Sequence, residues 1–544
     1  MKATHLVPMI LLAAALAAHA GTITVPGDYT LLQEAVEAAV SGDTVLLSAG
    51  VYDSLFYPPV VDTTQCVVYM KSGVSLLGEP GAIIDGDSLG RGIFCDGVTG
   101  VRIEGLTVRK AFAEMYGSGI FADDGAEVIV EDCVITDNHD GGVIVMDGSD
   151  VDFFDCEIND NHSKQGGGVA VENTCDVGFY GCRVLRNEAP AGGGVFVRAG
   201  CTVAFENCVI DSNLLPTVNG AAGGVSINNS TATMKNSRVN ANVSSGRGGG
   251  FAVTDNATVT IESTYVQNNE TTGDYGPGGG IYLEMATLVM RASVVTGNSA
   301  PGDDSDGGGL FLFFANACSL LQCTIAGNGT VDDELGGGIT SQYCSPVIEQ
   351  TILAFNGPGA GITCTDGTPV FSCCDLYGNT GGDAICGMDD GGNFSQDPRF
   401  CDDANDLFTL HCDSPCFPGR HPDGSSCGLI GAETIGTCDG VGVDQGSAPE
   451  GIAPPLRHYA SPNPNRNGTT IHFGVLRAGR VSVAIYDVAG RRVRMLEDRD
   501  LGAGAQQVEW DSRDDAGRPV SSGIYFYRIT GDPSPRSGRL VITR

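Results

Sequence analysis

The chain has 544 residues, and 79 of them are glycine, about 15% and roughly twice the usual share. It contains 66 acidic and 30 basic residues, for a net charge of −36, and its apolar content of 42% is too high for a disordered chain. The acidity argues against a nucleic acid or an anionic membrane as partner. The glycines lack the three-residue period of collagen, and their number disfavours a helical protein because interior glycine destabilises helices.

The first 20 residues have the pattern of a secretory signal peptide. Lys2 provides the positive start, an apolar stretch covers 6–17, and Ala18-His19-Ala20 matches a cleavage site, so we expect the mature chain to begin at Gly21. About 12 apolar residues are too few to span a membrane, and no later segment is long and apolar enough. We therefore expect a secreted protein, extracellular or on the outer-membrane surface, whose 20 cysteines can form disulfides.

A short amphipathic helix is predicted at the start of the mature chain. Thr30 and Gln33 have the spacing of a capping box. The apolar face of this segment comprises Leu32, Ala35, Val36 and Ala39. Strand-like segments follow at 42–47 and 50–52.

A unit of about 27 residues then repeats ten times. Each unit contains an asparagine, a small residue five positions before it, and apolar residues three before and two after the small one. The asparagines are Asn138, Asn161, Asn187, Asn213, Asn242, Asn269, Asn298, Asn328, Asn356 and Asn379. The small residues are Cys133, Cys156, Cys182, Cys208, Ser237, Thr264, Ser293, Cys323, Thr351 and Cys374. The segments between them alternate as strands do and contain no helical stretch.

Units this short bury their apolar faces only by stacking, as in a solenoid. Equivalent residues then lie about 4.8 Å apart and form ladders. We expect the asparagines to lie at a bend in the left-handed conformation and to bond the amides above and below. We interpret glycine clusters such as 166–168 as left-handed turns, because a strand and no helix follows each, unlike a phosphate loop. Stacked cysteines, including Cys175 and Cys201, are close enough for some to be disulfides.

These ladders and the opening helix resemble the right-handed parallel β-helix of the pectate-lyase-like superfamily. The resemblance covers roughly 22–438 and implies an all-β solenoid of about 13 turns with an N-terminal helical cap. We assign 21–438 to this domain.

A cysteine-rich segment, 386–438, ends the predicted β-helix. Its cysteines are Cys386, Cys401, Cys412, Cys416, Cys427 and Cys438. We interpret them as disulfides that staple a loop-rich cap, with a pairing that spacing does not determine. A zinc site formed by His411, Cys412, Cys416 and His421 is the alternative.

A Gly/Pro/Ala/Ser-rich linker at 439–456 precedes a compositionally different region, 457–544. This region has 14 basic and 9 acidic residues, a charge of +5, against −41 for the rest of the chain. Alternating runs such as 481–486 and 523–529 predict a small β-sandwich. The motifs at 461–464, 485–491, 508–511 and 522–525 resemble the C-terminal sorting domain of type IX secretion, which overlaps the flagellar-hook-cap immunoglobulin-like domains. The resemblance implies the secretion machinery as a partner.

The strongest catalytic candidates lie on two adjacent repeats. They are Asp137, His139 and Asp140 on one, and Asp160, His162 and Lys164 on the next. Each histidine directly follows a ladder asparagine, so we expect the two rings to be neighbours that carboxylates tune as acid and base.

Two acidic loops suggest calcium as a candidate cofactor. The candidate ligands are Asp303, Asp304 and Asp306 on one loop and Asp332, Asp333 and Glu334 one turn later. Stacked carboxylates repel each other, and Ca²⁺ relieves that repulsion. A solvated acidic rim is the alternative interpretation.

Three functions remain open at this level. We favour a surface or extracellular protein that contacts a polysaccharide or a cell-envelope glycan without catalysis. The first alternative is a polysaccharide lyase or glycoside hydrolase that acts on an acidic polysaccharide, although cations for such a substrate are sparse. The second is a structural spacer, since this fold hosts all three roles.

Overall fold

The computed structural model describes most of the chain. The described residues are 20–60, 64–112, 118–303, 305–331, 335–402, 407–432, 459–461, 468–475, 479–487, 491–501, 504–515, 517–521, 523–530 and 536–542. The contacts divide the chain into two compact units, Met1–Val441 and Gly442–Arg544. The predicted signal peptide, except Ala20, and the predicted linker lie outside the described residues.

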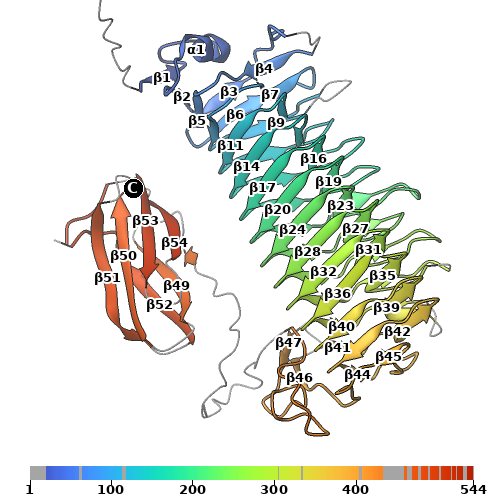
Figure 1. Cartoon of the computed structure of the whole chain (residues 1–544). Helices are drawn as coiled ribbons and strands as arrows, with labels where there is room; N and C mark the ends of the chain where they lie inside the picture. Colours follow the sequence, from blue (N-terminus) through green and yellow to red (C-terminus); the bar gives the residue numbers. More distant parts are fainter. Residues whose placement is uncertain are drawn as a thin grey trace, which may run out of the picture. The chain divides into compact units, whose positions relative to one another are not determined.

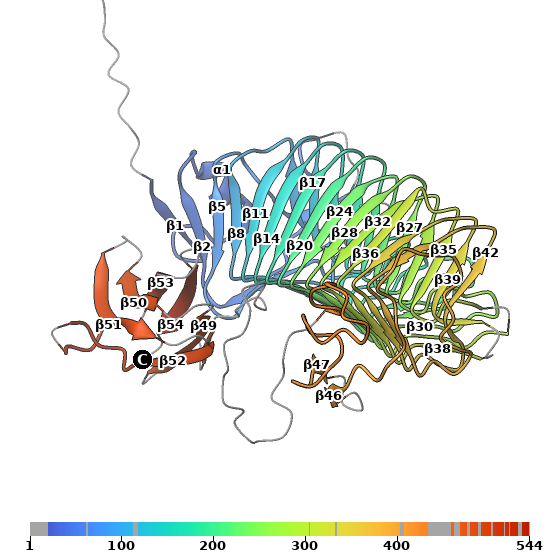
Figure 2. The same ribbon diagram turned by 60° about the horizontal axis from the view of Figure 1, so that its bottom comes forward.

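The first unit is a parallel β-helix, in which each turn adds one strand to each of three long sheets (Figure 1). Sheet A has 15 strands, sheet B has 13 and sheet C has 12, and a smaller sheet D of 5 strands joins the loops. Within a turn the chain passes through sheets C, A and B in that order (Figure 2). The twelve strands of sheet C agree with the expectation of about 13 turns.

The strands of sheet A are β1 (Thr22–Val25), β2 (Thr44–Leu47), β5 (Ser75–Gly78), β8 (Val101–Glu104), β11 (Glu127–Glu131), β14 (Asp150–Phe154), β17 (Asp176–Tyr180), β20 (Thr202–Glu206), β24 (Thr231–Lys235), β28 (Thr258–Glu262), β32 (Thr287–Arg291), β36 (Ala317–Leu321), β40 (Val347–Glu349), β43 (Val370–Ser372) and β45 (Met388–Asp389). Those of sheet B are β3 (Gly50–Tyr52), β6 (Ala82–Asp85), β9 (Thr107–Arg109), β12 (Val134–Thr136), β15 (Glu157–Asn159), β18 (Arg183–Leu185), β21 (Val209–Asp211), β25 (Arg238–Asn240), β29 (Tyr265–Gln267), β33 (Val294–Thr296), β37 (Thr324–Ala326), β41 (Ile352–Ala354) and β44 (Asp375–Tyr377).

The strands of sheet C are β4 (Cys66–Tyr69), β7 (Arg91–Asp96), β10 (Ile120–Asp123), β13 (Val143–Val145), β16 (Val169–Glu172), β19 (Val195–Arg198), β23 (Val225–Asn228), β27 (Phe251–Thr254), β31 (Ile281–Glu284), β35 (Leu310–Phe313), β39 (Gly336–Gln342) and β42 (Ala360–Thr365). Those of sheet D are β22 (Leu214–Leu215), β26 (Val243–Ser244), β30 (Glu270–Thr271), β34 (Ser299–Ala300) and β38 (Gly329–Thr330).

The repeated apolar positions form the core, as predicted. Side chains alternate along each strand between the interior and the outer face, so a five-residue strand of sheet A has three outward positions. Identical residues stack inside the solenoid: the rings of Phe153, Phe179 and Phe205 follow one another at centroid distances of 5.0 and 5.1 Å.

The asparagine ladder is confirmed in every predicted turn. Each Nδ2 donates to Oδ1 of the asparagine in the next turn at 2.8–3.0 Å, from Asn138 to Asn379. The left-handed residue is, however, the one before the asparagine, for example Asp160 (φ 55°) and Ala241 (φ 52°). The prediction placed the bend one position too late, because the asparagine itself is selected for its amide bonds.

The glycine clusters have two causes instead of the single one predicted. The first glycine of a cluster is left-handed, as in Gly192 (φ 60°). The last is required by stacking, since a Cβ on Gly194 would lie 2.7 Å from the carbonyl oxygen of Gly224 and 2.9 Å from Nδ2 of Asn213. Neighbouring turns therefore approach too closely there for any side chain.

The predicted helical cap is present as α1 (Leu32–Ala38), with Leu32, Ala35 and Val36 buried. The predicted capping box is wrong, because no side chain caps its N-terminus. Gln33 instead pairs with the free edge of β4: its Oε1 accepts from the Tyr69 N–H at 3.0 Å and its Nε2 donates to the Tyr69 carbonyl at 3.4 Å. The helix thus covers an edge that would otherwise expose unpaired backbone groups.

The disulfides differ from the stacked pairs that we considered. Ladder cysteines such as Cys156 and Cys182, and the pair Cys175 and Cys201, are not disulfide-bonded. The bonds found are Cys364–Cys386 and Cys373–Cys427, and Cys401 is also disulfide-bonded. Of the six cysteines expected to staple the cap, Cys386, Cys401 and Cys427 are disulfide-bonded, Cys412 and Cys416 are free, and Cys438 lies outside the described residues.

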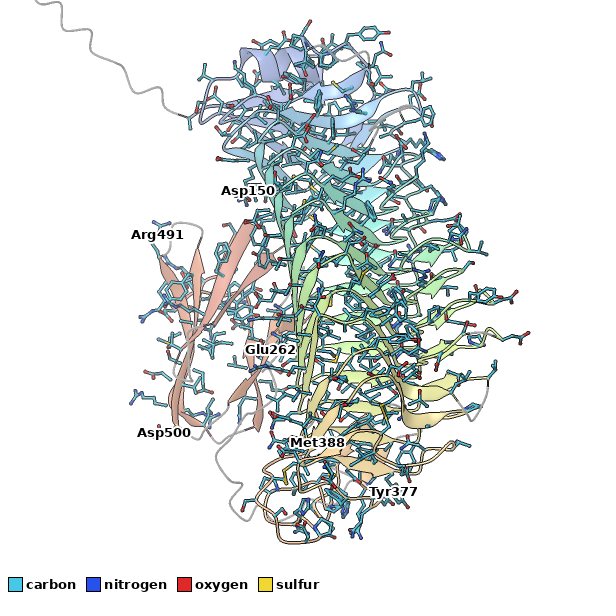
Figure 3. All side chains as sticks on the ribbon, turned by 45° about the vertical axis from the view of Figure 1, so that its right-hand side comes forward. Asp150, Glu262, Tyr377, Met388, Arg491 and Asp500 are labelled. Carbon is cyan, nitrogen blue, oxygen red and sulfur yellow. A yellow bond between two sulfur atoms is a disulfide. The ribbon has the colours of Figure 1, made fainter. Side chains whose placement is uncertain are left out.

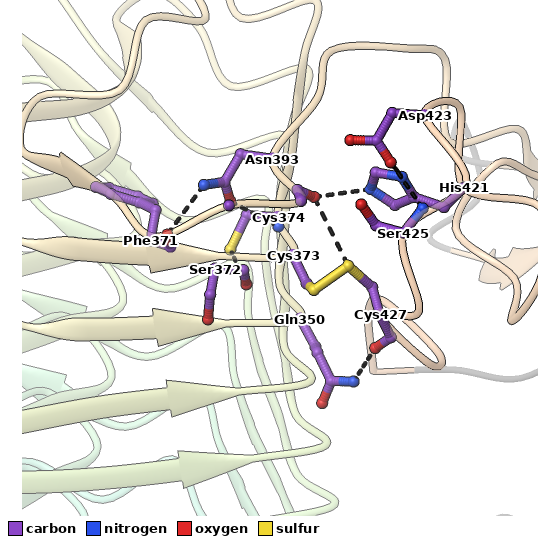
Figure 4. Close-up of a disulfide and its surroundings, with 12 residues drawn as sticks. Gln350, Phe371, Ser372, Cys373, Cys374, Asn393, His421, Asp423, Ser425 and Cys427 are labelled. Atoms are coloured by element: carbon purple, nitrogen blue, oxygen red, sulfur yellow. Dashed lines mark hydrogen bonds and ion pairs between the residues drawn. A yellow bond between two sulfur atoms is a disulfide. The ribbon is translucent and has the colours of Figure 1, made fainter.

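The cysteine-rich segment does more than close the end of the solenoid. Its described residues 399–402 and 407–432, here called the strap, include β46 (Phe400–Asp402) and β47 (Leu407–Leu410) and pack against the outer face of sheet B. Phe408 contacts Val294 and Ala326. Cys427 ties the strap to the last turns through Cys373, beside the bond from Gln350 to the Cys427 carbonyl (Figure 4).

The second unit is a β-sandwich, as predicted. A three-stranded sheet has the order β48 (Tyr459–Ser461), β49 (Thr469–Val475), β52 (Gly504–Trp510). A four-stranded sheet has the order β51 (Arg492–Leu501), β50 (Gly479–Asp487), β53 (Gly523–Thr530), β54 (Arg536–Ile542). All pairings are antiparallel, and buried residues of both sheets, including Ile471, Trp510 and Tyr527, form its core.

Candidate functional site

The two histidines predicted to be neighbours do lie together. The rings of His139 and His162 are 6.4 Å apart with an interplanar angle of 18°, and both side chains are exposed. His162 Nδ1 lies 3.7 Å from Glu188, the next residue of the same column. His139, His162 and Glu188 each directly follow a ladder asparagine, so they form a second column of stacked residues on the loop surface.

The carboxylates expected to tune these histidines are used differently. Both oxygens of Asp160 accept from Arg186, at 2.8 and 2.7 Å. Asp140 is buried, whereas Lys164 is exposed on the surface. The predicted cluster thus becomes a pair of histidines beside one glutamate, with Asp160 held in a separate ion pair.

The predicted calcium loops are described only in part. Asp304, Asp332, Asp333 and Glu334 lie outside the described residues, and Asp303 is exposed. Oδ1 of Asp306 accepts from the N–H groups of Gly307 and Gly336, at 2.8 and 2.9 Å, and from the Thr340 hydroxyl. That oxygen therefore joins two turns of the backbone.

The four zinc ligands considered in the strap do not form one cluster, because Cys416 and His421 have other partners. His421 contacts Asp423 Oδ1 at 2.6 Å and the Gly392 carbonyl at 2.7 Å, so both ring nitrogens are engaged (Figure 4). Cys416 donates to Asp375 at 3.3 Å. Among the described residues, the one group with metal-ligating atoms close together is His411, Cys412 and Asp413, three consecutive residues.

A different group lies on the outer face of sheet A, and we call it the acidic–aromatic site. It comprises Glu127, Asp150, Asp152, Phe154, Asp176 and Tyr180. The register places Asp150 between Glu127 and Asp176 on successive strands. Asp150 and Glu262 both point outward from sheet A (Figure 3).

A glycine makes room for the aromatic part of this site. The rings of Phe154 and Tyr180 stack at 4.9 Å with an interplanar angle of 16°. A Cβ on Gly178 would lie 2.5 Å from the Tyr180 ring and also collide with Asp152 Oδ1. The tyrosine therefore folds over the backbone of β17 and brings its hydroxyl end toward Asp152.

The carboxylates of the site repel one another, which makes it harder for each of them to ionise. Partial burial, then the Asp176 and Glu127 carboxylates, raises the pKa of Asp150. Partial burial, then Asp150 and Asp176, raises the pKa of Asp152. Burial and the nearby acids also raise the pKa of Tyr180. Such a surface repels anions and offers hydrogen-bond acceptors beside an apolar ring pair.

Sequence reasoning missed this site, although its signal is present. Asp150 and Asp152 are two apart, which puts both on one face of a strand, and Asp176 follows one repeat later. The sequence favoured His139 and His162 instead, because each directly follows a ladder asparagine and has acidic neighbours.

The family comparison agrees with this architecture. The family model described as right handed beta helix region matches residues 91–265 and 223–395, more than half of the chain. The chain belongs to this family. The β-helix is followed by a match of residues 475–534 to the FlgD Ig-like domain, within the β-sandwich. No curated protein matches the chain significantly.

Several solved structures are similar to this β-helix protein over different shares of its length. Latent PorU and PorZ, both from Porphyromonas gingivalis, are 23% and 32% identical over 17% and 16% of this chain, with TM-scores of 0.15 and 0.13. The chain covers only 10% and 11% of those two proteins. Pectate lyase Pel9A is 12% identical over 76% of this chain and 96% of its own, with a TM-score of 0.31. Within the described part of the β-helix protein, no helix has the length and apolarity needed to cross a membrane.

Proposed function

We propose that this protein is an exported β-helix scaffold that binds a polysaccharide on the outer face of sheet A without catalysis. The observation that carries the proposal is the acidic–aromatic site, where a stacked ring pair lies beside several carboxylates. Aromatic rings with a few placed polar groups are the usual composition of a binding site for an uncharged ligand with apolar and hydroxylated faces. The carboxylates favour a neutral polysaccharide over an acidic one.

The test is a binding panel of neutral and acidic polysaccharides, with and without Ca²⁺. We expect Phe154→Ala with Tyr180→Ala to weaken binding of the best neutral polymer at least tenfold. Tyr275→Ala is the matched control, because Tyr275 is an exposed tyrosine in a loop outside sheet A. Equal binding by the double variant and the control would reject the site, and no binding by the unmodified protein would favour a structural spacer.

A glycoside hydrolase is the second candidate, favoured by the raised pKa values of Asp150 and Asp152. A carboxyl group with a raised pKa is better suited to act as a general acid next to another carboxylate. We would follow new reducing ends and ultraviolet absorbance. Reducing ends that disappear in Asp150→Asn or Asp152→Asn would establish hydrolysis, whereas absorbance lost in His139→Ala or His162→Ala would point to a lyase at the histidine pair.

We further propose that 457–544 directs the protein to the cell surface through the secretion machinery. The motif resemblance of this region to sorting domains supports this, as do the predicted signal peptide and the disulfides, which are typical of exported proteins. Deletion of 457–544 should leave the protein in the periplasm, as measured by cell fractionation. Unchanged surface delivery would contradict the proposal.

A further inference from the structure

At the corner between sheets C and A, the backbone has the same left-handed conformation in successive turns. In three consecutive turns, however, this position holds a residue type that rarely adopts that conformation. In eleven successive turns, a residue at the end of the sheet C strand is left-handed, with φ between 43° and 63°; it directly follows the strand in every turn except that of β13, where it is the second residue after it. These residues are Gly97, Asp124, Asp147, Asn173, Ala199, Asn229, Asp255, Met285, Phe314, Tyr343 and Asp366. Glycine, asparagine and aspartate suit this conformation, whereas methionine, phenylalanine and tyrosine do not.

The three large residues are consecutive and exposed. Met285, Phe314 and Tyr343 have exposed fractions of 44%, 47% and 45%. They therefore combine unfavourable backbone angles with apolar surface in water and contribute little to the core. Departures of this kind from local preference cluster at functional sites.

The rings at this corner form a second aromatic platform. Phe314 and Tyr343 stack at 4.6 Å with an interplanar angle of 9°, and Phe313 meets Phe314 edge-on at 4.6 Å. Phe313 also stacks at 6.2 Å on Phe311, which is buried in a cluster with Tyr282. The platform is therefore anchored in the fold by Phe311 and open to solvent at Phe314 and Tyr343.

A row of threonines lies on sheet A between this platform and the acidic–aromatic site. The first outward position of each intervening strand is a threonine: Thr202, Thr231, Thr258 and Thr287. The middle outward positions are Ala204, Thr233, Thr260 and Val289, and the last are Glu206, Lys235, Glu262 and Arg291. From β17 to β36 is five turns, roughly 24 Å at 4.8 Å per turn. Both ring pairs border the same continuous sheet, with a row of threonines along one edge and two acidic and two basic side chains along the other.

We infer that the Phe314–Tyr343 platform is a second anchor for the polysaccharide, which lies along sheet A and contacts both aromatic pairs. This inference rests on the proposed function. An uncharged, linear chain fits because hydroxyl groups can bond the threonines while its apolar faces meet the rings at each end. Two linked contacts give a long chain an avidity that a short fragment does not have.

The test uses a double variant that the fold should tolerate. Phe314→Asn with Tyr343→Asn installs the residue that the same corner carries at Asn173 and Asn229, so the melting temperature should not fall. Gly replacements at both positions are the second variant if the first fails to fold. Gly97→Asn, at the same corner of the turn before β8 and so outside the stretch between the two ring pairs, is the matched control.

The probe is the neutral polymer that binds best among dextran, pullulan, galactomannan and laminarin, together with its own oligomers of increasing length. We expect the double variant to bind the long polymer at least tenfold more weakly, and the shortest binding oligomer within twofold of the unmodified protein. Unchanged binding of the long polymer would overturn the second anchor and leave the proposed function intact. Failure of the unmodified protein to bind any polymer would overturn both. If the unmodified protein forms dimers and the double variant does not, the platform is a self-association surface and the inference is rejected.

Discussion

At the scale of single residues, the asparagine ladder contributes most to the register of the turns. The Asn242 side chain makes four hydrogen bonds: Nδ2 donates to Asn269 Oδ1 at 2.9 Å and to the Ile210 carbonyl at 3.0 Å. Its Oδ1 accepts from the backbone N–H of Asn213 at 3.0 Å and from its Nδ2 at 2.9 Å. Every polar atom of this fully buried side chain is therefore satisfied.

Asn242→Ala should lower the free energy of unfolding by about 2–4 kcal/mol, because it leaves several buried donors and acceptors without partners. Urea denaturation measures this loss. Asn219→Ala is the control: Asn219 is exposed in a loop, so its replacement should change stability by less than about 0.5 kcal/mol. Equal effects of the two variants would contradict the structural role of the ladder.

The glycines separate into those required by stacking and those required by turn geometry. Gly194→Ala forces a Cβ to within 2.7 Å of a backbone oxygen, so the turns must move apart. Gly148 has φ 76° with open space around its Cβ position, so Gly148→Asn should be mild. We expect soluble yield and melting temperature to fall sharply for the first variant only. A similar melting temperature for both would show that the turns separate easily.

At the scale of elements, the junction of the strap with the last turn contains a buried acid. Asp375 is fully buried; its carboxylate accepts from the Gln396 N–H at 3.1 Å and from the Cys416 thiol at 3.3 Å. Burial raises the pKa of Asp375 to about 7; the two hydrogen bonds oppose this shift, while Asp397 and Asp383 add to it. No cation is among these contributors.

The folded state therefore retains a proton that the unfolded state releases near pH 4. Stability should fall as the pH rises from about 4 to 7 and then remain lower, by up to about 4 kcal/mol. Asp375→Asn removes this loss, so the variant should be more stable than the unmodified protein at pH 8 and similar at pH 4. Melting curves across this range measure the difference. A stability difference between the two proteins that is independent of pH would contradict the raised pKa of Asp375.

The Cys373–Cys427 bond holds the strap against sheet B. Replacing both cysteines by serine should free the strap, since the bond closes a segment with a sequence separation of 54, worth about 4 kcal/mol of chain entropy. Limited proteolysis should then cut within 407–432 while the stacked turns remain resistant. Uncut straps would show that the contacts of Phe408 suffice without the bond.

At the scale of the whole molecule, the two units have separate hydrophobic cores. Removal of 442–544 should therefore leave the melting temperature of the β-helix within about 2 °C of its value in the full chain, because stability in a solenoid comes from neighbouring turns. Calorimetry of the full and shortened chains measures this. A larger shift would show that the two units stabilise one another.

The repeats were predictable because each turn stacks on the next in register. A residue such as Asn187 meets its equivalents in the neighbouring turns, so its column can be read from the sequence. The β-sandwich and the helical cap were also predicted. The position of the left-handed bend was not predicted, because the residue that adopts it varies from turn to turn, as Asp160 and Ala241 show, whereas the recurring asparagine lies one position later.

The sequence alone thus determined the solenoid, its ladders, the sandwich and the acidic character of the first region, since all four follow from periodicity and composition. Only the tertiary structure decided the pairing of Cys427 with Cys373, the path of the strap over sheet B, and the grouping of Asp152 with Tyr180. The reason is physical. Ladder contacts join equivalent positions, whereas these contacts join residues with no common period, and their distances depend on how the loops fold.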